Sequence, residues 1–302
     1  MIKTMLGSVR EFKKPTILTL LLIIGEVFIE VLIPFYTAEL VNRIKAGVEM
    51  QSVVRLGLIL VVMALLSLAC GAAAGFAGAR ASAGFARNLR RDIFERIQHF
   101  SFENIDRFSA PSLVTRMTTD IGYVQMAFMM TIRAAVRAPL MLIFAVVMAF
   151  LMGGSLAMTF VVVIPVLLFG LIMIARKAMP AFRAVFKKYD RMNESIEENV
   201  RAMRVVKGFA REDYEKEKFS AASDNIRRDF TYAERVVALN SPLMQFCLYF
   251  NMIFVLFVGA RLIITNQGST IDVGQIAAML TYGFQILMSL MMISMIYVTL
   301  TM

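Results

Sequence analysis

Apolar runs that are too long for a soluble fold constrain this chain more than any other feature. Of its 302 residues, 59% are hydrophobic, and several runs exceed the roughly 18 residues that indicate a membrane-spanning helix. We therefore expect an all-α integral membrane protein with six long transmembrane helices. The predicted spans cover residues 16–37, 53–79, 133–152, 156–176, 239–264 and 273–302.

The residues before the first span resemble a short helix that lies in the membrane interface. Apolar residues recur there at helical spacing with basic residues between them, which is typical of an interfacial amphipathic helix. The apolar run that follows is too long for a signal peptide and has no A-x-A-like cleavage site. We expect an interfacial elbow helix at residues 1–14.

The second span continues as a helix well beyond the membrane. Its later half is rich in small residues, including Gly71 and Gly75 at GxxxG spacing, which let helices approach closely in lipid. Apolar residues then recur every three or four positions from Phe85 to Phe100. A helix of about 45 residues would be about 70 Å long, more than twice the hydrocarbon thickness of a bilayer. The excess must project into water.

Basic residues indicate which side of the membrane these projections occupy. Four Lys and Arg residues precede the first span, nine lie in residues 80–137 and fifteen in residues 176–235, whereas the two opposite loops carry only four. Because basic residues mark the cytoplasmic side, we expect a cytoplasmic N-terminus and cytoplasmic excursions at residues 80–132 and 177–238. The protein would lie in the inner or plasma membrane. This distribution also argues against nucleic acid as the reason for the net charge of +10.

Each cytoplasmic excursion contains a reversal that resembles a contact point for a soluble partner. The first is SFENIDRFSAPS at residues 101–112, and the second lies within Arg201–Phe219. In the second, Gly208 breaks an amphipathic pattern, and a short acidic-basic turn of helix at residues 210–218 is expected to reverse the chain. The alternative is that both reversals are ordinary solvated helical turns.

Specific segments resemble the transmembrane domain of ABC exporters of the multidrug and peptide type. Residues 89–125 are similar to the first coupling-helix region of that family and include its usual R-x-x-x-D run at Arg116–Asp120. Residues 200–219 resemble the second region, where an I-K-x-F-x-x-E core is typical. The resemblance covers nearly the whole chain and implies the type IV ABC exporter transmembrane fold, with two coupling helices on cytoplasmic extensions.

The resemblance also implies partners and contact residues. Two identical or related subunits would pair around a central pathway, spans four and five would cross to the partner, and nucleotide-binding domains would drive alternating access through the coupling helices. The residues implied in these contacts are Glu103, Asn104, Asp106, Arg107 and Phe108 in the first coupling helix, and Phe209, Asp213, Tyr214 and Glu215 in the second.

The catalytic part of such a transporter is not found in this sequence. It contains no G-x-x-x-x-G-K-[ST] phosphate loop and no LSGGQ-like signature, so no catalytic residue, metal ligand or cofactor is assigned to this chain. ATP and Mg²⁺ are expected on a nucleotide-binding domain outside it. Because the chain ends inside an apolar helix without a basic stop, we expect a piece of a longer transporter rather than a permease subunit with a separate ATPase chain.

Glu26 and Glu30 are the most unusual residues of the predicted spans. They lie one helical turn apart in span one, where a charged side chain costs at least about 2.5 kcal/mol at the helix centre and should face protein or water. One interpretation is a site that attracts cationic substrates or switches by protonation. The other is a hydrogen bond to a neighbouring helix.

Further polar and methionine residues in spans five and six are candidates for the substrate pathway. The 24 methionines favour a broad apolar or amphipathic substrate, such as a drug, peptide or lipid, over a small ion. Each polar candidate could instead form a bond between helices. The candidates are Asn240, Met244 and Asn251 in span five, and Tyr282, Gln285, Ser289 and Met292 in span six.

Two other classes of membrane protein compete with the ABC interpretation. A secondary transporter or channel independent of ATP often has inverted repeats and paired broken spans, and no such pairing is found in the sequence. A membrane-embedded enzyme needs clustered nucleophiles or metal ligands in the spans. With a single histidine, His99, outside them, nothing supports this class.

Overall fold

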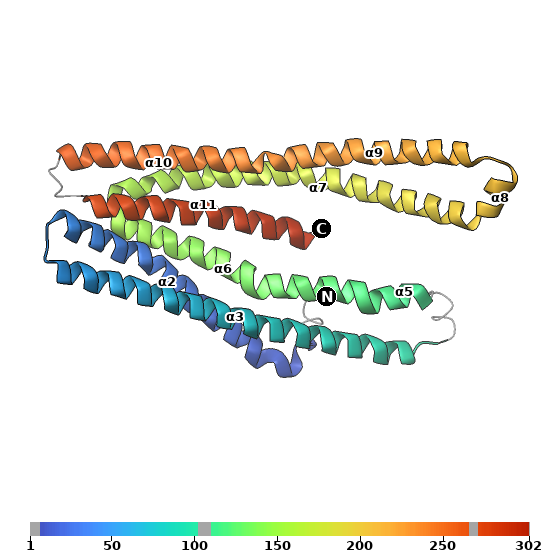
Figure 1. The fold of residues 1–302 in the computed structure, drawn as a ribbon, viewed down its shortest axis with the longest axis horizontal. Helices are drawn as coiled ribbons and strands as arrows, with labels where there is room; N and C mark the ends of the chain where they lie inside the picture. The colour runs from blue at the N-terminus through green and yellow to red at the C-terminus, as the bar shows by residue number, and fades with distance from the viewer. Residues whose placement is uncertain (1–6, 102–109, 266–270, 302) are drawn as a thin grey trace. The chain divides into compact units, whose positions relative to one another are not determined.

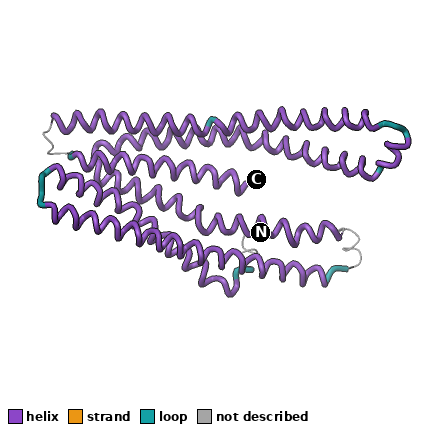
Figure 2. The backbone as a smooth tube through the Cα atoms, viewed as in Figure 1, coloured by secondary structure: helices purple, strands orange, loops and turns teal. Residues whose placement is uncertain are grey.

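The computed structural model describes residues 7–101, 110–265 and 271–301. Every regular element in these residues is a helix, as Figure 2 shows. The elements are η1 (Arg10–Phe12), α2 (Lys13–Lys45), α3 (Met50–Gln98), α5 (Ala110–Thr115), η2 (Arg116–Asp120), α6 (Ile121–Gly153), η3 (Gly154–Ala157), α7 (Met158–Arg201), α8 (Met203–Gly208), α9 (Glu212–Ala238), α10 (Asn240–Thr265) and α11 (Val273–Thr301).

Each predicted span lies on one of these helices. Five helical stretches of the described chain are long and apolar enough to cross a membrane, and the longest of them, Pro111–Arg201, contains both α6 and α7. The two helices are separated by a turn in which Gly154 has φ +50° and ψ −116°. Such a φ disfavours residues with a β-carbon. The three residues between predicted spans three and four therefore form a glycine turn, while the membrane boundaries of the six spans stay predictions.

The length predicted for the second helix is confirmed. α3 runs for 49 residues without interruption, which corresponds to about 74 Å at 1.5 Å per residue. Its N-terminal half exposes large aliphatic side chains such as Leu58 and Leu68, whereas its middle is buried at small residues such as Ala74, Gly78 and Ala81. The small residues in the middle of α3 therefore allow neighbouring helices to pack closely against it. Of the two glycines at GxxxG spacing, only Gly71 is approached by another helix. A β-carbon on Gly75 would have no neighbour within 4 Å.

The chain divides into two units, Met1–Val162 with Phe250–Met302, and Val163–Tyr249. In the first unit α2 packs against α3, α6 and α11, and α11 packs against α6 (Figure 1). The inner stripe of α2 is buried at every fourth residue, with Ile23, Val27 and Val31 at its centre. This spacing follows from 3.6 residues per helical turn.

The second unit is a long helical hairpin. In Figure 1, α7 and α9 lie side by side, and α8 lies at the end where the chain reverses. Ala178 and Ala233 are buried between the helices, Phe182 and Phe230 form an edge-to-face pair with ring centroids 6.0 Å apart, and the Nζ of Lys188 lies 2.5 Å from Asp229. The amphipathic pattern predicted before Gly208 thus lies on a helix whose apolar side chains pack against the returning helix.

The segment before α2 packs against protein. The side chain of Val9 is buried, the Ser8 hydroxyl donates a hydrogen bond to Asp92 (2.9 Å), and the Asn88 amide donates one to the Ser8 carbonyl (3.0 Å). The guanidinium of Arg10 is 2.9 Å from Asp92. Residues 1–6 of the predicted elbow helix lie outside the described residues. The interfacial position of the elbow helix stays a prediction.

Replacing Asp92 by Ala should detach this N-terminal segment from α3. The change removes a hydrogen bond and an ion pair that share one carboxylate, and a bond to a charged group contributes about 1.5–3 kcal/mol. We expect a lower unfolding temperature and faster proteolysis near residue 8. Glu95→Ala, which removes only an exposed pair with Arg91 on the same helix, is the matched control. Equal behaviour of the two variants would contradict the assignment.

Candidate functional site

An ion triad joins two helices inside the predicted membrane region. Glu26 and Glu30, four residues apart on α2, project from the same face of the helix. Arg137 of α6 reaches both, with its Nη1 2.6 Å from Oε1 of Glu26 and its Nη2 2.6 Å from Oε2 of Glu30. A single guanidinium thus donates one hydrogen bond to each carboxylate, a fork geometry that suits arginine.

A glycine on a third helix makes room for the triad. A β-carbon on Gly71 of α3 would lie 2.9 Å from Oε1 of Glu26, which is too close for any larger residue without movement of the carboxylate. The side chain of Glu26 is accordingly only 12% exposed, whereas those of Glu30 and Arg137 are each 33% exposed. Glu26 is therefore the enclosed member of the triad, and Glu30 is the more open one.

The triad adds a partner that sequence reasoning did not assign. Arg137 was counted among the basic residues taken to mark the cytoplasmic side, and the structure places it beside Glu26 and Glu30. Its position within the predicted third span, two residues before Pro139, was the signal that could have found it. The alternative in which the glutamates bond a neighbouring helix is thereby realised, and the attraction of a cationic substrate stays a hypothesis.

A small cavity adjoins the open side of the triad. Its volume is about 150 Å³, and α2, α6 and α11 all contribute to its wall. It brings together four residues selected from the sequence: Glu30, Gln285, Ser289 and Met292. The remaining lining residues are Arg137, Ala138, Met141, Phe284 and Met288.

The other pathway candidates have different surroundings. The Tyr282 side chain is fully buried, and its hydroxyl donates a hydrogen bond to the Val31 carbonyl at 2.9 Å, so it connects α11 to α2. Asn251 is buried against Gly283 of α11. Both act as contacts between helices, the alternative considered for such residues. Asn240 and Met244 belong to the second unit, where Met244 is buried.

The tip of the second unit carries the predicted second coupling region. The short helix at the reversal is α8, Met203–Gly208, and α9 then begins at Glu212. The expectation that residues 210–218 form a separate reversing helix is wrong. Ala210 has φ +49°, a left-handed conformation that no right-handed helix contains, and residues 212–218 are the first turns of the long α9.

Three of the four candidate contact residues at this tip face outward. The Phe209 side chain is 77% exposed, that of Tyr214 is 59% exposed and that of Asp213 is 98% exposed. Asp213 accepts a hydrogen bond from the Lys216 ammonium at 3.0 Å, and this bond raises the pKa of Lys216 above its ordinary value of 10.5. Lys216 therefore stays positively charged at neutral pH beside the exposed carboxylate.

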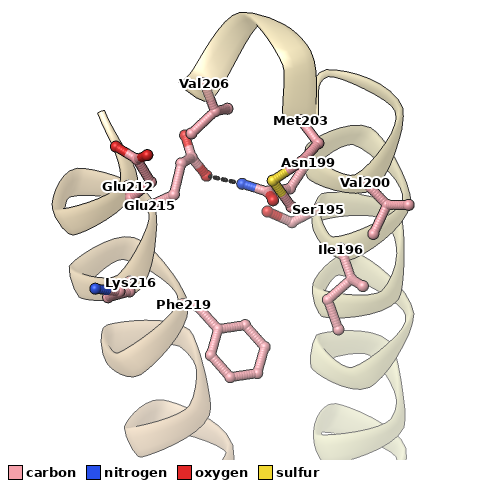
Figure 3. A pocket seen from close by; sticks show the side chains of 10 residues that line it. All are labelled: Ser195, Ile196, Asn199, Val200, Met203, Val206, Glu212, Glu215, Lys216 and Phe219. Carbon is pink, nitrogen blue, oxygen red and sulfur yellow. Dashed lines mark hydrogen bonds between the residues drawn. The ribbon is translucent and has the colours of Figure 1, made fainter. Parts of the chain in front are cut away.

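The fourth residue, Glu215, holds the two arms of the hairpin together. Its carboxylate accepts a hydrogen bond from the Asn199 amide of α7 at 2.9 Å, as Figure 3 shows. Beneath this bond lies an open apolar pocket of about 460 Å³ between α7 and α9. The side chains of Ile196 and Phe219 point into the space between the helices from opposite sides (Figure 3). Glu215 thus has a role within the hairpin that the sequence did not reveal.

The first predicted coupling region cannot be placed in the same way. Glu103, Asn104, Asp106, Arg107 and Phe108 all lie outside the described residues. The R-x-x-x-D run that follows them, Arg116–Asp120, forms a π-helical turn at the start of α6. In the described part of the chain, no group of three His, Cys, Asp or Glu residues could hold a metal ion.

Comparison with known proteins identifies the family. The model of the ABC transporter transmembrane region matches residues 16–291, so the chain belongs to this family and forms the membrane domain of an ABC transporter. That domain is not itself the catalytic part of such transporters. The fold is the exporter type, and the chain is a multi-pass membrane protein.

Several curated relatives are ABC transporter proteins of about twice the length. The uncharacterized ABC transporter ATP-binding protein YfiB of Bacillus subtilis is 28% identical over 269 residues, which are 89% of this chain and 46% of that protein. An uncharacterized ABC transporter ATP-binding protein of Mycobacterium tuberculosis is 29% identical over 287 residues, 95% of this chain and 49% of that protein. An ATP-dependent lipid A-core flippase of Aromatoleum aromaticum is 27% identical over 188 residues, 61% of this chain and 31% of that protein. The chain therefore spans about half the length of the first two relatives.

Removing the cation of the triad should destabilise the first unit. Arg137→Gln leaves two neighbouring carboxylates without their partner, and an unpaired charge inside a membrane span costs at least about 2.5 kcal/mol. We expect a clearly lower unfolding temperature in detergent, with most of the loss recovered in the variant that also carries Glu26→Gln and Glu30→Gln. Arg133→Gln, one turn away on the same helix, is the control. A loss that the added substitutions do not recover would show that charge pairing is not the cause.

Proposed function

We propose that this chain is the membrane-spanning half of an ATP-driven ABC exporter and forms the pathway for amphipathic or apolar drugs, peptides or lipids. The observation that carries the proposal is the α7–α9 hairpin. Two helices of 44 and 27 residues hold an exposed tip at the far end of a chain segment that begins in a predicted span. Such a tip is suited to receive movement from a partner outside the membrane.

The proposed partner at the tip is a nucleotide-binding domain. The names of the relatives include an ATP-binding function, and ATP with Mg²⁺ would bind to that domain rather than to this chain. Phe209, Asp213 and Tyr214 would make the contact in the second coupling region, and residues 103–108 would do so in the first. With these tips in the cytoplasm, the N-terminus would be cytoplasmic too, as the basic residues indicate, and the membrane would be the inner or plasma membrane.

The proposed pathway runs between two such subunits, either identical or related. Within this chain the cavity beside Glu30 and Gln285 is the candidate for part of that pathway. Its wall combines a charged end with methionines, which adapt to ligands of varied shape. One relative is named as a lipid A-core flippase, which favours a lipid or another amphipathic molecule. Asn240 and Met244 stay candidates for the part of the pathway contributed by the second unit.

The competing proposal is a transporter or channel independent of ATP. The family match and the relatives' names weigh against it. Joint measurement of transport and ATP hydrolysis distinguishes the two, because ATP-independent transport would persist when hydrolysis is blocked.

Tyr214→Ala should uncouple ATP hydrolysis from transport in the transporter that contains this chain and its nucleotide-binding domain. The variant loses an exposed aromatic side chain at the proposed contact, and such side chains dominate binding energy at interfaces. We expect several-fold less substrate transported per ATP hydrolysed in liposomes. Tyr232→Ala is a matched control, because Tyr232 lies on the same helix and is also 59% exposed. Unchanged transport per ATP in Tyr214→Ala would refute the contact.

A further inference from the structure

We propose that the cavity between α2, α6 and α11 is a subsite for the protonated amine end of an amphipathic molecule, with Glu30 and Gln285 accepting its N–H hydrogen bonds. The inference rests on the proposed function, because it names the chemical class of substrate that the pathway would take. It is carried by the charge of the triad, by acceptors around the cavity and by the cavity's size.

The charge of the triad favours a cation. Two carboxylates share one guanidinium, which leaves one net negative charge next to the cavity. Glu26 is enclosed against Gly71, so the carboxylate that lines the cavity is that of Glu30. Only Oε2 of Glu30 is bonded to Arg137, and its second oxygen is available as an acceptor. In a membrane span, such excess charge is costly and a cationic ligand would offset part of that cost.

A second acceptor belongs to α11. The Oε1 atom of Gln285 is buried and has no hydrogen-bond partner among the described residues. Gln285 lines the cavity, and rotation of its side-chain amide would turn Oε1 toward a ligand there. A buried acceptor without a donor is destabilising by about 1–3 kcal/mol, and a donor from a ligand would remove that penalty. The hydroxyl of Ser289, one turn further on, donates its hydrogen to the backbone carbonyl of Gln285 at 2.7 Å, so this hydroxyl can offer the cavity only acceptor capacity.

This set of groups discriminates between head groups. An ammonium has three N–H donors and no acceptor, which matches the free oxygen of Glu30 and the Oε1 of Gln285. A phosphate or carboxylate could accept a hydrogen bond from the Nε2 of Gln285, but the net negative charge beside the cavity would repel it. Arg137 does not reverse this preference, because its guanidinium is already shared by two carboxylates at 2.6 Å each.

The size of the cavity limits what enters it to the head group. Its volume of about 150 Å³ is below the roughly 300 Å³ at which pockets for drug-sized molecules begin. A cavity of this size holds about one aromatic ring or a few water molecules. The apolar remainder of the ligand would extend over Phe284, Met288 and Met292, which line the cavity and are each more than two-fifths exposed.

The chain's lack of tryptophan allows a direct binding test. Because the sequence contains no Trp, Phe284→Trp would place a single fluorescent reporter on the cavity wall. The chain in nanodiscs of neutral lipid would be titrated with a long-chain primary alkylamine, the alkyl phosphate of equal length and the corresponding alcohol. We expect saturable binding of the amine that is at least about tenfold tighter than that of the other two. Isothermal titration of the unsubstituted chain provides a second measurement that needs no reporter.

The decisive variant is Gln285→Leu, which keeps the volume of the side chain and removes the acceptor. It should weaken amine binding by about tenfold, as expected for one hydrogen bond to a charged group, without changing the weak binding of the alcohol. Thr281→Val is the matched control, because the Thr281 hydroxyl is exposed one turn away on α11 and bonds only its own helix. An unfolding curve for each variant confirms that it is folded.

Two outcomes would overturn the inference. One is equal affinity for the amine, the phosphate and the alcohol, and the other is an equal effect of Gln285→Leu and Thr281→Val on amine binding. Both measurements use the membrane chain alone and need no ATP. Transport driven by ATP but without preference for amines would therefore reject the subsite and leave the exporter proposal standing. Amine binding without any ATP-dependent transport would reject the exporter proposal instead.

Discussion

The pairing of Arg137 with Glu26 and Glu30 is the interaction on which the first unit most depends. In a span that crosses a bilayer, a charged side chain has no water to solvate it and must find a partner in the protein. The partner here lies more than 100 residues away in the sequence, at 2.6 Å from each carboxylate. α2 and α6 are therefore held in one register, and Gly71 lets α3 pack against the same point. The cavity beside Glu30 exists because the helices meet at this charged junction.

In the second unit, the pairing of α7 with α9 makes the long hairpin stiff. α7 and α9 extend far beyond an apolar segment, and their pairing relies on a narrow seam of Ala178, Phe182 and Ala233 with one close ion pair. Toward the tip the seam opens over an apolar pocket, and the Asn199–Glu215 hydrogen bond closes it again (Figure 3). A paired hairpin bends less than a single helix, so force applied at α8 would be transmitted along it.

Sequence reasoning succeeded where the signal is local and repeated. The uninterrupted helix of α3 and the short gap before α7 follow from helical spacing and hydropathy. It failed where a single backbone angle or a distant partner decides. Ala210 adopts a left-handed conformation that alanine rarely takes, so the sequence-based prediction placed the start of α9 incorrectly. Arg137 was assigned to the membrane border because nothing near it in sequence identifies its two carboxylate partners.

The amino-acid sequence by itself determined that this chain is a helical membrane domain, because long apolar runs indicate membrane-spanning helices without any knowledge of packing. The ABC exporter type came from the resemblance of residues 89–125 and 200–219 to the coupling regions of that family. Only the tertiary structure decided which polar residues share a site. One cavity is lined by Glu30, Gln285, Ser289 and Met292. Tyr282 and Asn251 instead form contacts between helices. The physical reason is that each of these side chains lies on a helix with several neighbours, and helical spacing states which face a residue occupies but not which helix that face meets.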